Sequence, residues 1–331
     1  MTSQPADDPG AAPAAETPAN LWEPADGLPA PGAPEAAPSA FVLGVVGDSG
    51  SGKNTVADAV ARLLGPERIT DVRLDDYHRF TREERAARAL TALNPVVHNL
   101  ALMHEHLRLL RQGRPILNRS YNHDRGTFGP IRKIEPNEIV LVRGLLGFPT
   151  RELLSLYDLA VFLHPEPELL FRWKLRRDVL FRGYTEADVL KYIARHLLDA
   201  KEFILPQSER AHMLVHYELP DWEAPDSEVS TTIRLRRGAA ELARRNGLVP
   251  AIGIEQTEDG DDVVLRVPAT LDGQRVEEWG RSCTSLRYDP ATAGAYYDET
   301  GVLQHLPNLA FVEVLIAHLA TSLAAGPRPK P

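Results

Sequence analysis

Residues 41–53 read FVLGVVGDSGSGK, an apolar run followed by a glycine-rich turn and a lysine. The first six residues are a continuous apolar run of strand length, typical of a strand buried in a parallel sheet. The next seven fit the Gly-x-x-x-x-Gly-Lys pattern, and Val56, Val60 and Leu63 then mark one face of a helix. In such a turn, backbone N–H groups and the positive end of the helix face a phosphate chain, and the lysine reaches the β- and γ-phosphates. We therefore predict a nucleotide-binding loop made of Gly47, Asp48, Ser49, Gly50, Ser51, Gly52 and Lys53.

Further strand and helix patterns alternate along the chain after this loop. Short apolar runs at 139–142 and 159–163 predict two more buried strands. Helical patterns cover roughly 83–93, 99–111, 168–182 and 186–198. Strands that alternate with helices indicate an α/β fold, here a mainly parallel sheet of the P-loop NTPase type flanked by helices.

Three regions differ in composition. The first 40 residues hold 12 Ala, 9 Pro and six acids without any Lys or Arg, so we predict that 1–39 is a disordered acidic tail. Residues 40–219 form the predicted P-loop domain. From 220 to 331 we expect a strand-rich extension, with short strands at 231–235, 251–255, 263–267 and 284–287 and a final amphipathic helix at 305–323.

The composition bears on the cellular compartment of the protein and on the partners that it could bind. The net charge is −9, and because six of the acids lie in the tail, the folded part is nearly balanced and offers no basic face for nucleic acid. No apolar run approaches the roughly 18 residues of a membrane helix, and the N-terminus lacks the basic start and apolar core of a secretion signal. The single Cys283 excludes an intramolecular disulfide. We expect a cytoplasmic protein with no membrane or nucleic-acid partner.

Four segments between residues 74 and 203 resemble the phosphoribulokinase and uridine kinase family, and phosphoribulokinase most closely. They are LDDYH at 74–78, LNP at 93–95 followed by Asn99 and Met103, YNH at 121–123, and WKLRRD at 173–178 followed by RGY at 182–184. They occur in the family's order and are more specific than the phosphate loop alone. The C-terminal strands and final helix fit the extension of phosphoribulokinases loosely.

The resemblance implies a role for each matched residue. Asp75 would be the general base that accepts a proton from the attacking sugar hydroxyl, assisted by Lys53 and a second carboxylate, Asp178, near the metal. His78 and Arg82 would bind the sugar phosphate, with Tyr121 and His123 in the same pocket. Phosphate charge would be neutralised by Lys174, Arg177 and Arg182, and Thr55 would join the ATP-binding loop. Ordinary loop positions for the histidines, a solvated face for Arg177 and Arg182, and a helix cap for Asp76 are the alternatives.

Two positions depart from the family where it holds Mg²⁺. Asn54 replaces the Ser or Thr whose hydroxyl ligates the metal, and Arg143 replaces the Walker B carboxylate after strand 139–142. At about 5 Å and an effective dielectric of about 20, a guanidinium repels Mg²⁺ by roughly 6 to 7 kcal/mol, unless Arg143 swings away or pairs with Asp75 or Asp178. Asn54 and Asp178 are the remaining candidate metal ligands. Three hypotheses stay open: a weakened kinase, a kinase in which Arg143 acts as an arginine finger, and a binding protein without catalysis.

The sequence thus predicts an ATP- and Mg²⁺-dependent phosphotransferase that acts on the hydroxyl of a pentose phosphate. Ribulose 5-phosphate is favoured because a guanidinium fork at Arg82 suits a substrate that already carries phosphate. The alternatives are a uridine or nucleoside kinase and a regulatory protein that binds a nucleotide or a sugar phosphate. The oligomeric state stays open, a homo-oligomer included.

Overall fold

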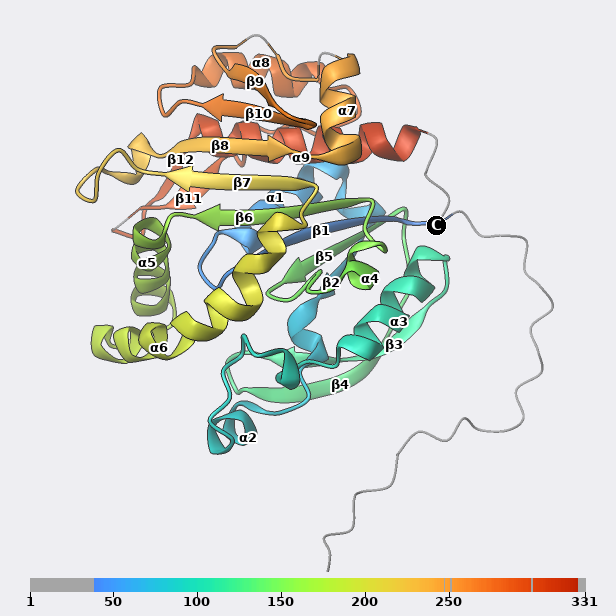
Figure 1. The fold of residues 1–331 in the computed structure, drawn as a ribbon, viewed down its shortest axis with the longest axis vertical. Helices are drawn as coiled ribbons and strands as arrows, with labels where there is room; N and C mark the ends of the chain where they lie inside the picture. Colours follow the sequence, from blue (N-terminus) through green and yellow to red (C-terminus); the bar gives the residue numbers. More distant parts are fainter. Residues whose placement is uncertain (1–38, 247, 251, 299, 327–331) are drawn as a thin grey trace, which may run out of the picture. The chain divides into compact units, whose positions relative to one another are not determined.

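The computed structural model describes residues 39–246, 248–250, 252–298 and 300–326. Within them, one sheet of eight strands runs through the protein (Figure 1). Five adjacent strands of this sheet run parallel to one another, and the remaining three pairs of neighbouring strands are antiparallel. The strand order is β2 (Ile69–Arg73), β5 (Ile139–Gly144), β1 (Phe41–Gly47), β6 (Leu159–Pro165), β7 (Met213–Glu218), β8 (Ser230–Leu235), β10 (Asp262–Val267) and β9 (Glu255–Asp259).

Helices cover both faces of this sheet, which explains why β1 is buried at every position. Leu43 and Val45 lie in one hydrophobic core, while Val42 and Val46 lie in the other, as the alternation of side chains along a strand requires. The helices are α1 (Lys53–Leu64), α2 (Arg82–Ala87), α3 (Leu100–Arg111), α4 (Arg151–Leu154), α5 (Pro167–Arg176), α6 (Glu186–Asp199), α7 (Arg237–Asn246), α8 (Gly273–Ser282) and α9 (Pro307–Ala325).

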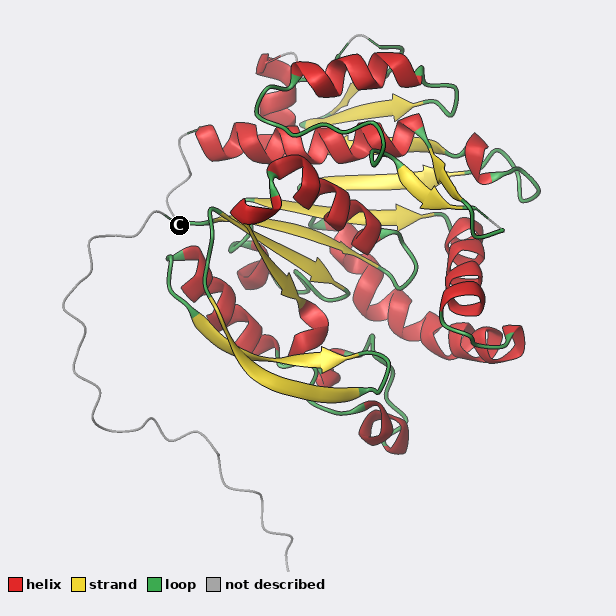
Figure 2. Cartoon of the chain, turned by 180° about the vertical axis from the view of Figure 1, so that it is seen from behind, coloured by secondary structure: helices red, strands yellow, loops and turns green. Residues whose placement is uncertain are grey.

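Two antiparallel ribbons lie outside the main sheet. One pairs β3 (Ile116–Asn122) with β4 (Thr127–Ile134) and is separate from the main sheet in Figure 2. The other pairs β11 (Ala295–Tyr297) with β12 (Leu303–His305). Both ribbons bring side chains to the candidate site described below.

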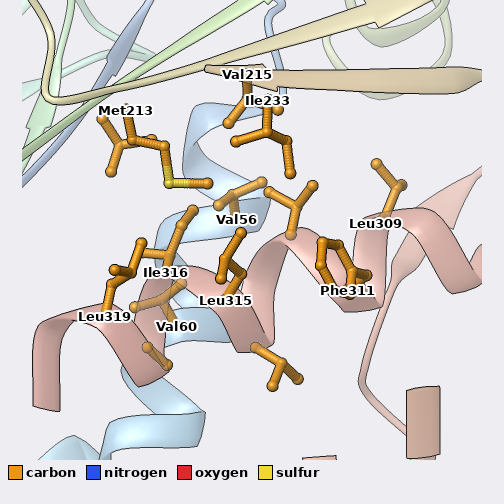
Figure 3. Close-up of a cluster of buried hydrophobic side chains, with 14 of the residues drawn as sticks. Val56, Val60, Met213, Val215, Ile233, Leu309, Phe311, Leu315, Ile316 and Leu319 are labelled. Carbon is orange, nitrogen blue, oxygen red and sulfur yellow. The ribbon is translucent and has the colours of Figure 1, made fainter. Parts of the chain in front are cut away.

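Helix α9 packs against α1 under the sheet. Figure 3 shows Val56 and Val60 of α1 beside Leu315 and Ile316 of α9, and all four side chains are at most 5% exposed. At about 25 cal/mol per Å² of apolar surface, fully burying one such side chain is worth about 1.5–3 kcal/mol. The last helix is therefore part of the same core as the phosphate-loop helix.

Most of the predicted strands and helices are confirmed. The strands predicted at 41–46, 139–142 and 159–163 are β1, β5 and β6, and those at 231–235 and 263–267 are β8 and β10. The helices predicted at 99–111 and 186–198 are α3 and α6. The one predicted at 168–182 is α5 followed by a π-helical turn, η4 (Arg177–Phe181).

Other predicted elements are wrong. The helix predicted at 83–93 ends at Ala87, and residues 284–287 form a turn instead of a strand. The strand predicted at 251–255 begins only at Glu255, and residue 251 lies outside the described part. The predicted tail at 1–39 also lies outside it, apart from Ser39. The boundary at 220 stays a prediction, since β7 and β8 on either side of it pair in one sheet.

The final helix is more deeply buried and more apolar than the sequence analysis expected. Helix α9 was predicted to be amphipathic, but its residues from Asn308 to Ala317 are all buried. Among the described residues it is also the one helix long and apolar enough to cross a membrane, with a mean hydropathy of 1.6, so the expectation that no run approaches this length is wrong. Because 61% of that window is buried inside the protein, its apolar character is that of a core helix.

Candidate active site

The phosphate loop joins the end of β1 to the start of α1. Gly50 and Gly52 have φ angles of 98° and 81°, in the left-handed region that favours glycine. A Cβ on Gly50 would lie 3.0 Å from Cβ of Lys174, so this glycine also allows the loop to approach α5. The loop residues Gly47–Gly52 thus precede the N-terminus of a 12-residue helix, an arrangement that binds phosphate groups.

Lys53 is the first residue of α1, and its charge interacts with that of Asp75, the predicted base. Its Nζ donates to the backbone carbonyl oxygen of Asp48 over 3.0 Å. Burial lowers the pKa of Lys53 to about 8, although the negative charge of Asp75 opposes this change. A bound phosphate would replace the lost solvation of the ammonium group and favour its charged form.

Helix α5 and η4 bring further cations to the loop. Lys174 is 5% exposed, and burial lowers its pKa. Arg177 donates from Nη2 to Oγ of Ser49 over 3.2 Å, which links η4 directly to the phosphate loop. The side chains of Arg177 and Arg182 both line the cavity beside the loop. The structure therefore brings all three predicted phosphate-neutralising cations to this region.

Asp178 holds two of these cations. Its carboxylate is 4% exposed and accepts from Nε of Arg177 over 2.8 Å, and it pairs with Nη1 of Arg182 at 3.2 Å. In this arrangement Asp178 orients guanidinium groups beside the loop. Its predicted place near a metal stays a prediction.

The resemblance to phosphoribulokinases implies Mg²⁺, and the side chains of the described residues do not fit a protein-bound metal ion. Arg143 donates from Nη1 to Asp58 over 2.7 Å and from Nη2 to Asp71 over 2.8 Å, rather than pairing with Asp75 or Asp178. No group of three or more His, Cys, Asp or Glu side chains among the described residues could hold a metal. The Asn54 side chain is exposed at the first turn of α1, as is that of its neighbour Thr55. No catalytic step is therefore assigned to a metal held by protein side chains.

Asp75 and His123 are joined by a hydrogen bond after the end of β2. Nε2 of His123 donates to Oδ2 of Asp75 over 2.9 Å, which joins the β3–β4 ribbon to the turn after β2. Burial alone would raise the pKa of Asp75, but the hydrogen bond from His123 and the positive charge of Lys53 hold this pKa well below its ordinary value. Asp75 is therefore ionised at neutral pH and able to accept a proton.

His78 is buried and neutral. Its Nδ1 lies 2.7 Å from the carbonyl oxygen of Asp75, which can only accept, and its Nε2 lies 2.8 Å from Nη1 of Arg85, which can only donate. The proton is therefore on Nδ1. Burial lowers the pKa of His78 to about 3, and its ring stacks on Tyr121 with centroids 4.7 Å apart.

Arg82 and Asp76 organise the neighbouring ribbon. Arg82 is exposed and donates to the backbone carbonyl oxygens of His123 and Asp124. Oδ1 of Asp76 accepts from the backbone N–H of Tyr121 over 2.7 Å, so this residue anchors β3 and does not cap a helix through that oxygen. Both residues thus hold the ribbon that carries His123.

The sequence did not reveal the role of Arg85. Its side chain is 9% exposed and donates to His78 and, over 3.0 Å, to the hydroxyl of Tyr121. Arg85 lies three residues after Arg82 on a helix, a spacing that many exposed residues share. The sequence therefore did not distinguish it from the neighbouring exposed arginines. Asp58 and Asp71 were missed for a different reason, because their partner Arg143 lies 85 and 72 residues away in the chain.

A cavity of about 480 Å³ opens beside the phosphate loop. The loop and α1 form one wall, and α5 with η4 forms another. Residues of β11, β12 and α9 complete it, so the C-terminal part of the chain contributes to the same cavity.

Comparison with known proteins agrees with this geometry. The model of the phosphoribulokinase / uridine kinase family matches residues 42–221. Phosphoribulokinase of Synechocystis sp. is 36% identical over 195 residues, or 59% of this chain and 58% of the relative. The chloroplastic phosphoribulokinase of Triticum aestivum is 28% identical over 213 residues, or 59% of this chain and 52% of the relative. The matches thus span little more than half the length of these relatives.

A solved structure supports the fold itself. Phosphoribulokinase from Rhodobacter spheroides superposes with a TM-score of 0.53 at 20% identity, covering 70% of this chain and 91% of that one. The family model matches more than half of the chain, and the matched part contains the phosphate loop, Asp75 and the cations of α5. The protein therefore belongs to the phosphoribulokinase / uridine kinase family.

Proposed function

We propose that this protein is an ATP-dependent kinase that transfers the γ-phosphate to a hydroxyl group of a pentose phosphate, with ribulose 5-phosphate as the favoured acceptor. The observation that carries the proposal is the ionised Asp75, paired with His123 and facing the charge of Lys53. The electrostatic interaction between Asp75 and Lys53 supports a role for Asp75 as proton acceptor at the loop that would hold the nucleotide phosphates.

The chemistry follows from what these side chains can do. Asp75 accepts the proton of the sugar hydroxyl as its oxygen attacks phosphorus, and the bond from the γ-phosphorus to the bridging oxygen of ADP breaks. Lys53, Lys174 and Arg177 stabilise negative charge on the phosphate oxygens. Phosphoryl transfer depends mainly on such positioning and electrostatic stabilisation. Mg²⁺ would enter with the nucleotide phosphates.

The side chains around Asp75 support a sugar that already carries a phosphate group as the acceptor. Neutral His78, stacked on Tyr121, offers a buried polar wall next to Asp75. Cations suited to a second phosphate group lie close by, with Arg85 buried behind His78 and Arg82 at the ribbon. Uridine is the alternative acceptor that membership of the family leaves open.

A second candidate function is a binding protein without turnover. It is favoured by one observation, the pairing of Arg143 with Asp58 and Asp71 where relatives would hold metal. Such a protein would be stabilised by ATP and ribulose 5-phosphate without releasing ADP. Cytoplasmic location and the oligomeric state also stay predictions.

The test is ADP release from ATP and Mg²⁺ with ribulose 5-phosphate, and with uridine as the control acceptor. A kinase releases ADP only when its acceptor is present, and Asp75→Asn is expected to abolish this release while ATP still binds. The double variant Asn54→Ser with Arg143→Glu tests the metal positions. If only the double variant turns over, the unmodified chain is a binding protein. If neither turns over with either acceptor, the proposed reaction is wrong.

A further inference from the structure

The end of β5 next to β1 is occupied by the guanidinium group of Arg143. In the sheet, Arg143 pairs in register with Val45 of β1, two residues before the phosphate loop. Its side chain bonds Asp58 at 2.7 Å and Asp71 at 2.8 Å. Asp58 lies four residues after Asn54, so both residues project from the same side of α1, and both line the cavity beside the loop. The partner of Arg143 is therefore one helical turn from the position at which the family implies a metal ligand.

The carboxylates nearest the loop are engaged by other groups. Asp178 accepts from Arg177 over 2.8 Å, and Asp75 accepts from Nε2 of His123 over 2.9 Å. Asp48 lies within the loop and accepts from the backbone N–H of the residue that follows it. A carboxylate that already accepts a hydrogen bond from a cation or from the backbone offers less negative charge to a second cation. Each of these three would have to give up or share its partner before it could ligate a metal ion.

The cations beside the loop outnumber the carboxylates that pair with them. Asp178 is the shared partner of Arg177 and Arg182, while Lys53 and Lys174 are buried next to them. Burial lowers the pKa of both lysines, and the charge of Arg177 lowers both further. Burial together with the charge of Arg177 also lowers the pKa of Arg182. Because desolvation and like charges both disfavour these cations, an anionic ligand of high charge would stabilise them.

We propose that the protein binds ATP as the metal-free anion at least as tightly as it binds the complex of ATP with Mg²⁺. The inference rests on the proposed function, because it concerns the nucleotide site of that kinase. Mg²⁺ cancels part of the negative charge of the triphosphate, so the free anion interacts more strongly with the cations beside the loop. A protein that ligates the metal regains this loss through its ligands, but here Asn54 and Arg143 stand where those ligands are implied.

The proposal also fixes how bound ATP interacts with Mg²⁺. Coupling between two ligands is reciprocal, since each changes the affinity of the other by the same factor. If Mg²⁺ does not strengthen the binding of ATP to the protein, ATP on the protein binds Mg²⁺ no more tightly than ATP in water does. The protein is therefore saturated by ATP in the presence of a chelator at concentrations that also saturate it with Mg²⁺ present.

The experiment compares ATP binding with and without the metal. Dissociation constants are measured by calorimetry on the full chain, in EDTA and in Mg²⁺ in excess over ATP, at equal ionic strength. In EDTA the constant is expected to be equal or lower. Arg143→Glu should reverse this order, with Mg²⁺ tightening ATP binding about 5-fold or more, the lower end of typical coupling between two ligands. Arg275→Glu is the matched control, because it makes the same charge change at a side chain of α8 that is 57% exposed and outside the cavity.

The unmodified protein decides the proposal even if Arg143→Glu does not fold. A dissociation constant that falls more than about 2-fold when Mg²⁺ replaces EDTA overturns it, as does a failure to bind ATP in EDTA. If Arg143→Glu folds and behaves like Arg275→Glu, Arg143 is not the cause and the argument fails. Should the protein bind ATP in EDTA as expected yet release no ADP with any acceptor, only the proposed reaction fails. Should Mg²⁺ tighten ATP binding while ADP is released with ribulose 5-phosphate, only the present inference fails.

Discussion

Replacing Arg143 with Met is expected to destabilise the protein while leaving its fold intact. The Arg143 side chain is 12% exposed and bridges Asp58 at 2.7 Å and Asp71 at 2.8 Å, so its loss leaves Asp58 without this partner and Asp71 with Arg73 alone. Two unit charges about 4 Å apart interact by about 4 kcal/mol at an effective dielectric of 20 and about 1 kcal/mol in water. Since Asp58 is 55% exposed and Asp71 is 35% exposed, both pairs need discounting for solvent screening.

The expected loss is therefore about 2–3 kcal/mol in the free energy of unfolding, toward the lower part of the Coulomb range. Urea unfolding followed by circular dichroism at pH 7 measures it. The control is Arg281→Met, which removes an exposed ion pair with Glu277 on α8 and should cost less than about 0.5 kcal/mol. If Arg143→Met costs no more than this control, the bridge does not stabilise the fold.

Arg143→Glu extends the same test to metal binding. It adds a carboxylate beside Asp58 and Asp71, so this variant alone is expected to respond to Mg²⁺ or Mn²⁺ without nucleotide. At a metal concentration 100 times the dissociation constant, the gain would be about 2.7 kcal/mol in the free energy of unfolding. Stabilisation of the unmodified protein by Mg²⁺ alone would refute the conclusion that the side chains in the described part of the chain form no metal site.

Glu313 has a pKa of about 8 in the folded state and an ordinary pKa of 4.5 in the unfolded state. Between these pH values the folded state holds a proton that the unfolded state has lost, so the free energy of unfolding falls as pH rises from about 4.5 to about 8. Urea unfolding at several pH values should show Glu313→Gln gaining on the unmodified protein by roughly 4–5 kcal/mol over this interval, and parallel curves would contradict it. Because Lys53 has a pKa of about 8, ATP binding should take up about half a proton at pH 8 and almost none at pH 6.5. Calorimetry in buffers of different ionisation enthalpy measures this uptake, and an equal uptake at both pH values would exclude Lys53 as its source. Arg85→Met leaves His78 without its donor and is expected to raise KM for ribulose 5-phosphate about tenfold, with KM for ATP unchanged, whereas exposed Arg88→Met should change neither.

The sequence predicted the parallel centre of the sheet because those strands are buried on both faces. Continuous apolar runs such as 41–46 are rare outside such strands. Strand β2 lacks this signal because Asp71 and Arg73 are exposed. The β3–β4 ribbon lacks it as well, since β4 has no fully buried residue. Residues 284–287 were wrongly predicted as a strand, because the sequence of so short a run does not show whether another strand pairs with it.

The candidate site was predictable where function requires a fixed spacing in the chain. The phosphate loop is of this kind, because it lies directly after a predicted strand, whereas Asp75 and His78 were indicated by the resemblance of residues 74–78 to the family. Partnerships across the fold were not predictable, and Arg143 is the clearest case. The sequence left open whether it swings away or pairs with Asp75 or Asp178, and in the structure it pairs with acids on β2 and α1. Charged side chains pair with whichever opposite charges the fold brings close to them, and separation along the sequence does not predict which charges these are.

The contact between α1 and α9 has a consequence for how the protein is made. Val56 and Val60 acquire their buried neighbours Leu315 and Ile316 only when a segment about 240 residues downstream of α1 has been synthesised. At about 5–20 residues per second, a ribosome needs roughly 12 to 50 s for that interval. During this time the apolar face of the phosphate-loop helix has no cover from α9. The nascent chain therefore keeps part of the core surface of α1 uncovered until α9 has been translated.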